Sequence, residues 1–100
     1  MRNHTKVYMT FFWLDESDYI ACEMCGAEGK DIHHIQARGL GGSKCMDYIE
    51  NLVCLCRECH TRAETEKQFN TYCRIQHVFN FRININKYLY ENEISKNKHD

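Results

Sequence analysis

The chain has 100 residues and a formal net charge of −1, which limits it to one domain and argues against a strongly basic protein that coats nucleic acid non-specifically. A small basic groove can still exist within a neutral total charge. A chain of this length buries only about two-thirds of its unfolded surface, so we expect its core to need additional support.

The cysteine content points to where that support comes from. The chain has seven cysteines, no stretch long enough to span a membrane, and acidic residues after its N-terminal apolar run, where signal-peptide cleavage would require small ones. We therefore expect a cytoplasmic protein. In that reducing compartment cysteines favour metal binding over disulfides.

Residues 1–19 form an N-terminal arm ahead of the first cysteine pair. The segment from Lys6 to Trp13 is rich in β-branched and aromatic residues. It predicts either a strand or an aromatic arm that packs on the rest of the chain, and both alternatives stay open. The acidic residues at 15–18 predict a turn.

Four of the cysteines form two Cys-x-x-Cys pairs, Cys22/Cys25 and Cys56/Cys59, with thirty residues between them. Gly26 directly follows the first pair, and glycine tolerates the positive φ that a zinc knuckle requires. Two pairs that close a large loop are typical of a structural zinc site. The alternative, two redox or disulfide pairs, is disfavoured by a reducing compartment. We expect the remaining cysteines to be small buried apolar residues: Cys45, Cys54 and Cys73.

Two short strands are expected between the cysteine pairs. Isoleucines flank His33 and His34 within residues 31–36, and residues 52–55 form a continuous apolar run that is typical of a buried strand. Adjacent side chains of a regular strand point to opposite faces. Both histidines therefore serve one site only if the backbone bends, which the glycine-rich loop at 37–42 would allow.

Helices are expected to follow the second strand. A helix that begins at Cys56 and continues to Ala63 would turn adjacent residues roughly 100° apart. Cys59 can then face the zinc while His60 faces elsewhere. The spacing of apolar residues predicts two further amphipathic helices, at 65–80 and 84–94.

Taken together, these residues resemble the HNH endonuclease family, the ββα-metal nucleases, in its zinc-bracketed form. The two cysteine pairs enclose His34 and Asn51, and His60 directly follows the second pair, in the family order, with separations of 17 and 9 residues between the three. The similarity covers about residues 20–63 and extends to small phage-borne members.

The resemblance implies an α+β fold, a small ββα-metal (His-Me finger) domain built around a structural zinc with four cysteine ligands, together with flanking helices. It also implies a single nuclease domain over residues 1–100, with a motif core at 20–63, the N-terminal arm at 1–19 and a C-terminal helical extension at 65–95.

The same resemblance implies metal-dependent hydrolysis of DNA phosphodiester bonds that leaves 5′-phosphate and 3′-hydroxyl ends. His34 is the implied general base, a role that suits an imidazole because it titrates near neutral pH. His33 and His60 are the implied ligands of one catalytic divalent ion, and Asn51 braces the loop and orients His34. Asp31 lies close enough in sequence to compete with His33. The ion stays open among Mg²⁺, Mn²⁺, Ni²⁺, Co²⁺ and Zn²⁺.

Arg38, in the glycine-rich loop, is a candidate phosphate contact, and Lys44, Arg57 and Arg62 are weaker ones. The histidines outside the motif are expected to be structural: His4, His77 and His99. Two alternatives to an independent nuclease remain. One is a non-catalytic zinc module that binds nucleic acid or a protein. The other is an accessory nuclease subunit of a phage packaging machine. These expectations fit a homodimer or a packaging partner. If the protein is phage-encoded, its expected location is the host cytoplasm.

Overall fold

The computed structural model describes residues 2–37 and 44–97, without the side chains of residues 44, 88 and 91–97. Its elements, in chain order, are α1 (Asn3–Phe11), β1 (Asp31–His34), two short 3₁₀ turns (Lys44–Met46 and Ile49–Asn51), β2 (Leu52–Leu55), α2 (Arg57–Thr65) and α3 (Lys67–Asn97). Within these ranges, no helix has an apolar stretch of the length that a bilayer crossing requires.

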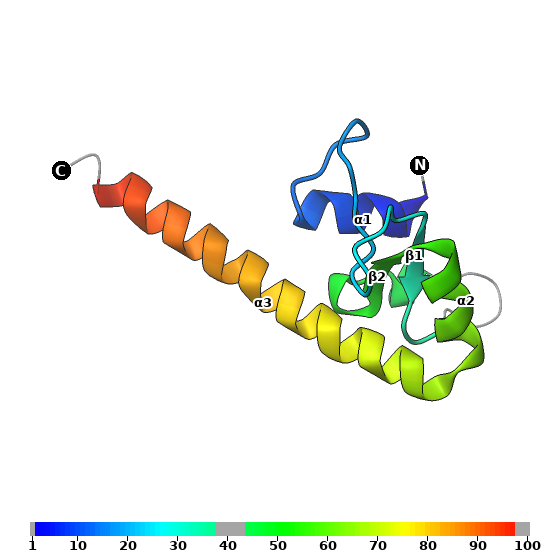
Figure 1. Cartoon of the computed structure of the whole chain (residues 1–100). Coiled ribbons are helices and arrows are strands. Elements are labelled where there is room, and N and C mark those ends of the chain that lie inside the picture. Colours follow the sequence, from blue (N-terminus) through cyan, green and yellow to red (C-terminus); the bar gives the residue numbers. More distant parts are fainter. Residues whose placement is uncertain (1, 38–43, 98–100) are drawn as a thin grey trace.

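The two strands pair antiparallel and form the centre of an α+β fold (Figure 1). Every residue of β2 is buried, and alternate residues contribute to two different cores. Val53 and Leu55 pack with residues of α2 and α3, whereas Leu52 and Cys54 pack with Tyr8 of α1. The continuous apolar run at 52–55 is therefore explained by helices on both faces of a very small sheet.

The N-terminal arm is a helix that packs on β2, so of the two alternatives for Lys6 to Trp13 the strand is wrong and the packed aromatic arm is observed. In α1 the buried residues are His4, Tyr8 and Met9, which share one face of a helix. β-branched and aromatic residues favour strands only where a pleated surface is available to them. Within the described residues no neighbouring strand pairs with this segment, and burial of a helical face against β2 decides its structure.

The two helices expected at 65–80 and 84–94 are one continuous helix, α3. Neither proline nor glycine occurs between residues 67 and 97, so nothing in the backbone chemistry ends the helix. Phe81, inside the expected break, stacks on Phe11 of α1 with ring centroids 4.8 Å apart. Asn84 also donates to the Phe11 carbonyl at 3.3 Å. Beyond these contacts α3 extends away from the body of the molecule (Figure 1), and Leu89 and Tyr90 are exposed.

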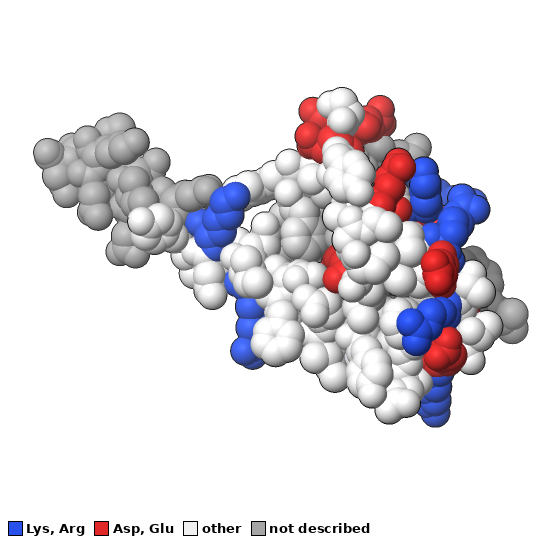
Figure 2. Space-filling model, viewed as in Figure 1, with Lys and Arg blue, Asp and Glu red and all other residues white. Residues whose placement is uncertain are grey.

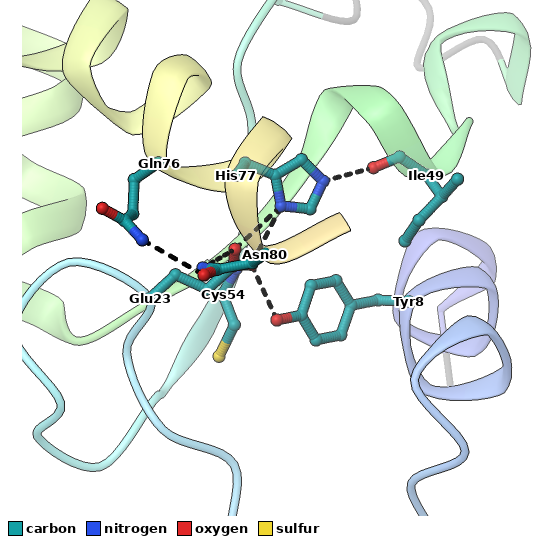
Figure 3. Close-up of polar contacts among 7 residues, drawn as sticks. All are labelled: Tyr8, Glu23, Ile49, Cys54, Gln76, His77 and Asn80. Carbon is teal, nitrogen blue, oxygen red and sulfur yellow. Dashed lines mark hydrogen bonds and ion pairs between the residues drawn. The ribbon is translucent and has the colours of Figure 1, made fainter. Parts of the chain in front are cut away.

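A buried carboxylate joins α1, the first cysteine pair and α3 (Figure 3). Glu23 lies between Cys22 and Cys25 in the chain. It accepts hydrogen bonds from the Tyr8 hydroxyl at 2.7 Å, the Cys54 amide at 3.1 Å, His77 Nδ1 at 2.8 Å and Asn80 Nδ2 at 2.8 Å.

His77 is the cationic partner of this carboxylate. Its Nδ1 donates to Glu23 and its Nε2 donates to the Ile49 carbonyl at 2.7 Å, so both ring nitrogens carry protons. Burial opposes the charged form, but the hydrogen bond and charge of Glu23 outweigh it and raise the pKa of His77. For Glu23, burial is likewise outweighed by His77, and the net effect lowers the pKa of its carboxyl.

Candidate metal centre and active site

The four cysteines of the two Cys-x-x-Cys pairs converge on one point. Their Sγ atoms all lie within 4.8 Å of one another, and those of Cys25 and Cys56 are 3.7 Å apart. Tetrahedral zinc with thiolate ligands places sulfur atoms about 3.8 Å apart, so these residues fit a structural zinc ion. Gly26 has φ 80°, which confirms the conformation expected for the glycine after the first pair.

Backbone amides donate to sulfur atoms of this cluster, although burial and the neighbouring thiols raise the pKa of Cys59. Cys56 caps α2, and its Sγ accepts the Cys59 amide at 3.4 Å. Burial opposes ionisation of Cys22, but hydrogen bonds from the amides of Cys56, Cys25 and Met24 outweigh it and lower the pKa of its thiol to about 7. Thiolates are the form that binds zinc.

The three other cysteines lie apart from this cluster. Cys54 and Cys73 are buried as predicted, and burial raises the pKa of Cys54 to about 12 and that of Cys73 to about 11. Cys45 is exposed, so the prediction of burial is wrong for this residue. It lies in the 3₁₀ turn Lys44–Met46, outside both cores.

A second group of metal-ligating side chains joins β1 to α2. His33, His60 and Glu64 each offer a ligand atom within 4.8 Å of the others. His60 and Glu64 are one helical turn apart, with His60 Nε2 2.7 Å from Glu64 Oε1. Cys59, the neighbour of His60, belongs to the cysteine cluster, which confirms that adjacent residues of this helix face different sites. Glu64 is not among the residues predicted from the sequence, although its i+4 spacing from His60 in a predicted helix is a signal that could have found it.

Hydrogen bonds hold both imidazoles of this group in place. His60 Nδ1 lies 3.0 Å from Asp31 Oδ2, which also pairs with Arg57. Asp31 therefore contacts a ligating histidine and is not itself a member of the group around His33. A carboxylate behind a histidine is a common way to orient a metal ligand.

The surroundings of His33 favour a neutral imidazole. The Asn70 amide nitrogen donates to the Ile35 carbonyl, so its Oδ1 is the atom that accepts from His33 Nε2, at 2.8 Å. The Nδ1 atom of a neutral His33 is then left with a free lone pair. Burial lowers the pKa of His33 and favours this neutral form.

The His34 imidazole has different neighbours. Its Nε2 is 2.7 Å from Asp47 Oδ1, whose side chain is fully buried, and Asp47 Oδ2 accepts from Asn3 Nδ2 at 3.0 Å. The His4 ring of α1 meets the His34 ring edge-on, with centroids 4.7 Å apart. Because a carboxylate only accepts, His34 Nε2 carries a proton and Nδ1 of the neutral ring holds a lone pair.

Asn51 braces the backbone beside these histidines. Its Oδ1 accepts the Gln36 amide at 2.7 Å, and its Nδ2 donates to the carbonyls of Gln36 at 3.1 Å and Met46 at 3.0 Å. The Asn51 carbonyl also accepts from Ile35. These bonds tie the end of β1 to the segment that carries Asp47, the partner of His34.

The histidines share one open cavity of about 370 Å³. It is lined by the following residues: Arg2, His4, Ile32, His33, His34, Ala37, His60 and Glu64. His33 and His34 thus belong to different side-chain groups, as strand alternation predicts, while both border the same space. Arg2, which precedes α1, and His4 of α1 form part of its wall, although neither was predicted from the sequence to belong to the site.

The structure describes the side chains of only two of the four candidate phosphate contacts. Arg38 lies outside the described residues, and so does the side chain of Lys44. Arg57 pairs with Asp31, and Arg62 pairs with Glu66 and stacks on Phe69. On the face shown in Figure 2, basic and acidic side chains alternate along the edge that carries α2 and do not form a continuous basic surface.

Comparison with known protein families decides the classification. Residues 22–66 match the family model described as HNH endonuclease. This segment is an HNH-family domain. It spans both cysteine pairs, β1, β2 and α2, and its last residues include Glu64. Comparison with curated proteins and with solved structures gave no significant match.

Proposed function

We propose that this protein is a metal-dependent endonuclease that hydrolyses DNA phosphodiester bonds. The observation that carries the proposal is the shared cavity. A histidine held by a buried carboxylate and a separate metal-ligating group both line it, inside an HNH domain. Phosphodiester hydrolysis needs a base for the attacking water and positive charge at the phosphate.

His34 is the proposed general base. Its Nε2 donates to Asp47, and its Nδ1 is the atom available to accept a proton from water. The Asp47 carboxylate stabilises the imidazolium that results and keeps the ring in the required tautomer. Asn51 supports this arrangement indirectly. It holds the backbone of Gln36, close in sequence to His34, and of Met46, next to Asp47.

His33, His60 and Glu64 are the proposed ligands of the catalytic divalent ion. Two imidazoles and one carboxylate suit several divalent metals, so the choice among Mg²⁺, Mn²⁺, Ni²⁺, Co²⁺ and Zn²⁺ stays open. When bound, such an ion would supply the charge that stabilises the phosphorane and the leaving oxygen. Asp31 and Asn70 orient the two imidazoles, and the four cysteines hold a structural zinc that is separate from the reaction.

Cleavage of supercoiled plasmid by the purified protein, with each divalent ion in turn, tests the proposal. We expect His34→Ala to lower kcat by about 10²- to 10⁴-fold, because a general base contributes that much. Lys87→Ala, an exposed change on α3, is the matched control and should cleave normally. Equal cleavage by His34→Ala and wild type would rule out His34 as the base.

Two other outcomes would point to the alternatives. Binding of DNA without cleavage under any of these ions would favour a non-catalytic zinc module. Cleavage that appears only after a partner protein is added would favour an accessory subunit. A comparison of DNA with RNA of the same sequence tests the substrate class.

A further inference from the structure

His4, His34 and Asp47 form a third group of potential metal ligands, distinct from the cysteine cluster and from the group around His33. Each offers a ligand atom within 4.8 Å of the other two. The three residues come from α1, from β1 and from the segment after the first 3₁₀ turn. His4 and Asp47 are buried, and His4 and His34 border the open cavity.

The donor set is one that zinc prefers. Two imidazole nitrogens and one carboxylate oxygen, with a fourth position open, are the ligands of several catalytic zinc sites. The three donors already lie close together, because Asp47 Oδ1 is 2.7 Å from His34 Nε2 and the rings of His4 and His34 are in contact. Small side-chain rotations would therefore bring them to zinc-binding distance.

We propose that His4, His34 and Asp47 bind a zinc ion that inhibits the nuclease, an inference that rests on the proposed role of His34 as general base. In the active form His34 Nε2 carries a proton that it donates in a hydrogen bond to Asp47, and Nδ1 holds a lone pair. Zinc at Nε2 displaces that proton, and a neutral imidazole has only one other place to carry it, which is Nδ1. The proton moves to Nδ1 by exchange through solvent, so there is no net release of a proton. Nδ1, the atom that must accept a proton from the attacking water, is then already protonated.

Zinc stoichiometry tests the site without reference to activity. In equilibrium dialysis at micromolar free Zn²⁺, we expect about three ions per chain for wild type, one for each ligand group. His4→Asn and His60→Ala should each bind about one fewer, and the double variant about two fewer. Lys6→Ala, an exposed change on α1, is the control and should bind as wild type does.

Because His4 is buried, folding of His4→Asn must be checked by circular dichroism. If it does not fold, Asp47→Asn takes its place in the dialysis measurement. A wild type that binds no more zinc than His4→Asn, with both folded, would overturn the site.

Plasmid cleavage in Mg²⁺ with added Zn²⁺ tests the inhibition. With each protein compared with its own rate in the absence of Zn²⁺, we expect zinc to inhibit wild type, and His4→Asn to require at least about 10-fold more zinc for the same fractional inhibition. Equal zinc sensitivity of the two proteins would overturn the inhibitory role and place the effect at the group around His33. If wild type cleaves nothing, the proposed function fails, whereas the dialysis result still decides whether this zinc site exists.

Discussion

At the scale of single residues, the chemistry of the cavity depends on which nitrogen of each histidine carries a proton. Neighbouring groups make that choice: Asn70 for His33, Asp47 for His34 and Asp31 for His60. Two of these partners are carboxylates on buried or half-buried side chains, where a charge-assisted hydrogen bond is stronger than at the surface. The chemistry available to the cavity is therefore fixed by residues that do not themselves border it.

Replacement of Asp47 by Asn is predicted to lower kcat more than it raises KM. The carboxylate accepts from His34 and Asn3 through two different oxygens, whereas an amide has one acceptor oxygen and an NH₂ donor, so the tautomer of His34 is no longer specified. Loss of such an orienting partner costs about 10- to 100-fold in activity. Steady-state cleavage kinetics of Asp47→Asn beside Asp47→Glu measure this effect. A pure KM effect in both variants would contradict the assigned role.

Glu64→Gln is predicted to weaken the affinity for the catalytic divalent ion. An amide oxygen lacks the charge of the carboxylate, so we expect the ion concentration for half-maximal activity to rise by about 10- to 100-fold. Cleavage measured across an Mg²⁺ or Mn²⁺ titration gives that concentration. Glu58→Gln, an exposed change on the same helix, is the control. Unchanged ion dependence in Glu64→Gln would remove Glu64 from the ligand set.

At the scale of the elements, α1 and α3 contact the HNH domain through polar as well as apolar groups. The ion pair of Glu23 and His77 links α3 to the first cysteine pair, and Tyr8 brings α1 to the same carboxylate (Figure 3). Each residue of the pair is almost completely buried, at 6% and 1% side-chain exposure. Removal of one partner leaves a charge in the core without compensation.

His77→Gln is predicted to destabilise the protein by about 3–5 kcal/mol, since it leaves the Glu23 charge without its cationic partner. Urea unfolding of the zinc-saturated protein, monitored by circular dichroism, measures this loss. Arg74→Ala, an exposed change one turn earlier on α3, should have little effect. A loss as small as that of Arg74→Ala would indicate that the pair is not a significant source of stability.

The same pair predicts a pH dependence of stability. The contribution of the pair is the difference in unfolding free energy between wild type and the Glu23→Gln/His77→Gln double variant. The pH dependence of zinc binding is common to both proteins and cancels in this difference. The folded pKa of His77 is raised above 6.5, so its share is complete below 6.5 and is lost as pH rises through the folded pKa.

The folded pKa of Glu23 is lowered below 4.5, so its share is complete above 4.5 and is lost as pH falls through the folded pKa. The difference in unfolding free energy should therefore be largest between pH 4.5 and 6.5. Urea unfolding of both proteins from about pH 4 to about pH 9 tests this, and a difference that grows above about pH 7 would have the wrong sign.

At the scale of the whole molecule, two small cores and a cluster of four cysteines connect the elements of the fold. The cores lie on opposite faces of β2, and each contains few large side chains. The cysteine cluster closes the chain between the first pair and the start of α2, across the two strands. A structural zinc of this kind contributes about 10–16 kcal/mol, as much as the stability of an entire domain.

Removal of the structural zinc is therefore predicted to unfold the HNH domain. A high-affinity chelator should abolish most of the tertiary circular dichroism signal and all cleavage, and re-addition of zinc should restore both. Cys56→Ser/Cys59→Ser should behave in the same way without a chelator. Retention of the folded signal by zinc-free protein would show that the two cores suffice.

The sequence by itself determined the parts of the site that lie close together in the chain. The Cys-x-x-Cys spacing, the glycine after the first pair, the apolar run of β2 and the 100° turn between Cys59 and His60 follow from local geometry, and the structure confirms each of them. A continuous apolar run indicates that both faces of the strand are buried, whichever elements cover them.

Only the tertiary structure decided the conformation of residues 3–11, the continuity of α3 and the neighbours of the histidines. Aromatic and β-branched residues favour a strand, but burial of one face of the segment against β2 overrides that preference. Asp47, Asn70 and His4 meet the histidines of β1 from 13, 37 and 30 residues away. No local pattern encodes such contacts, because they arise only when α1, the sheet and α3 pack together.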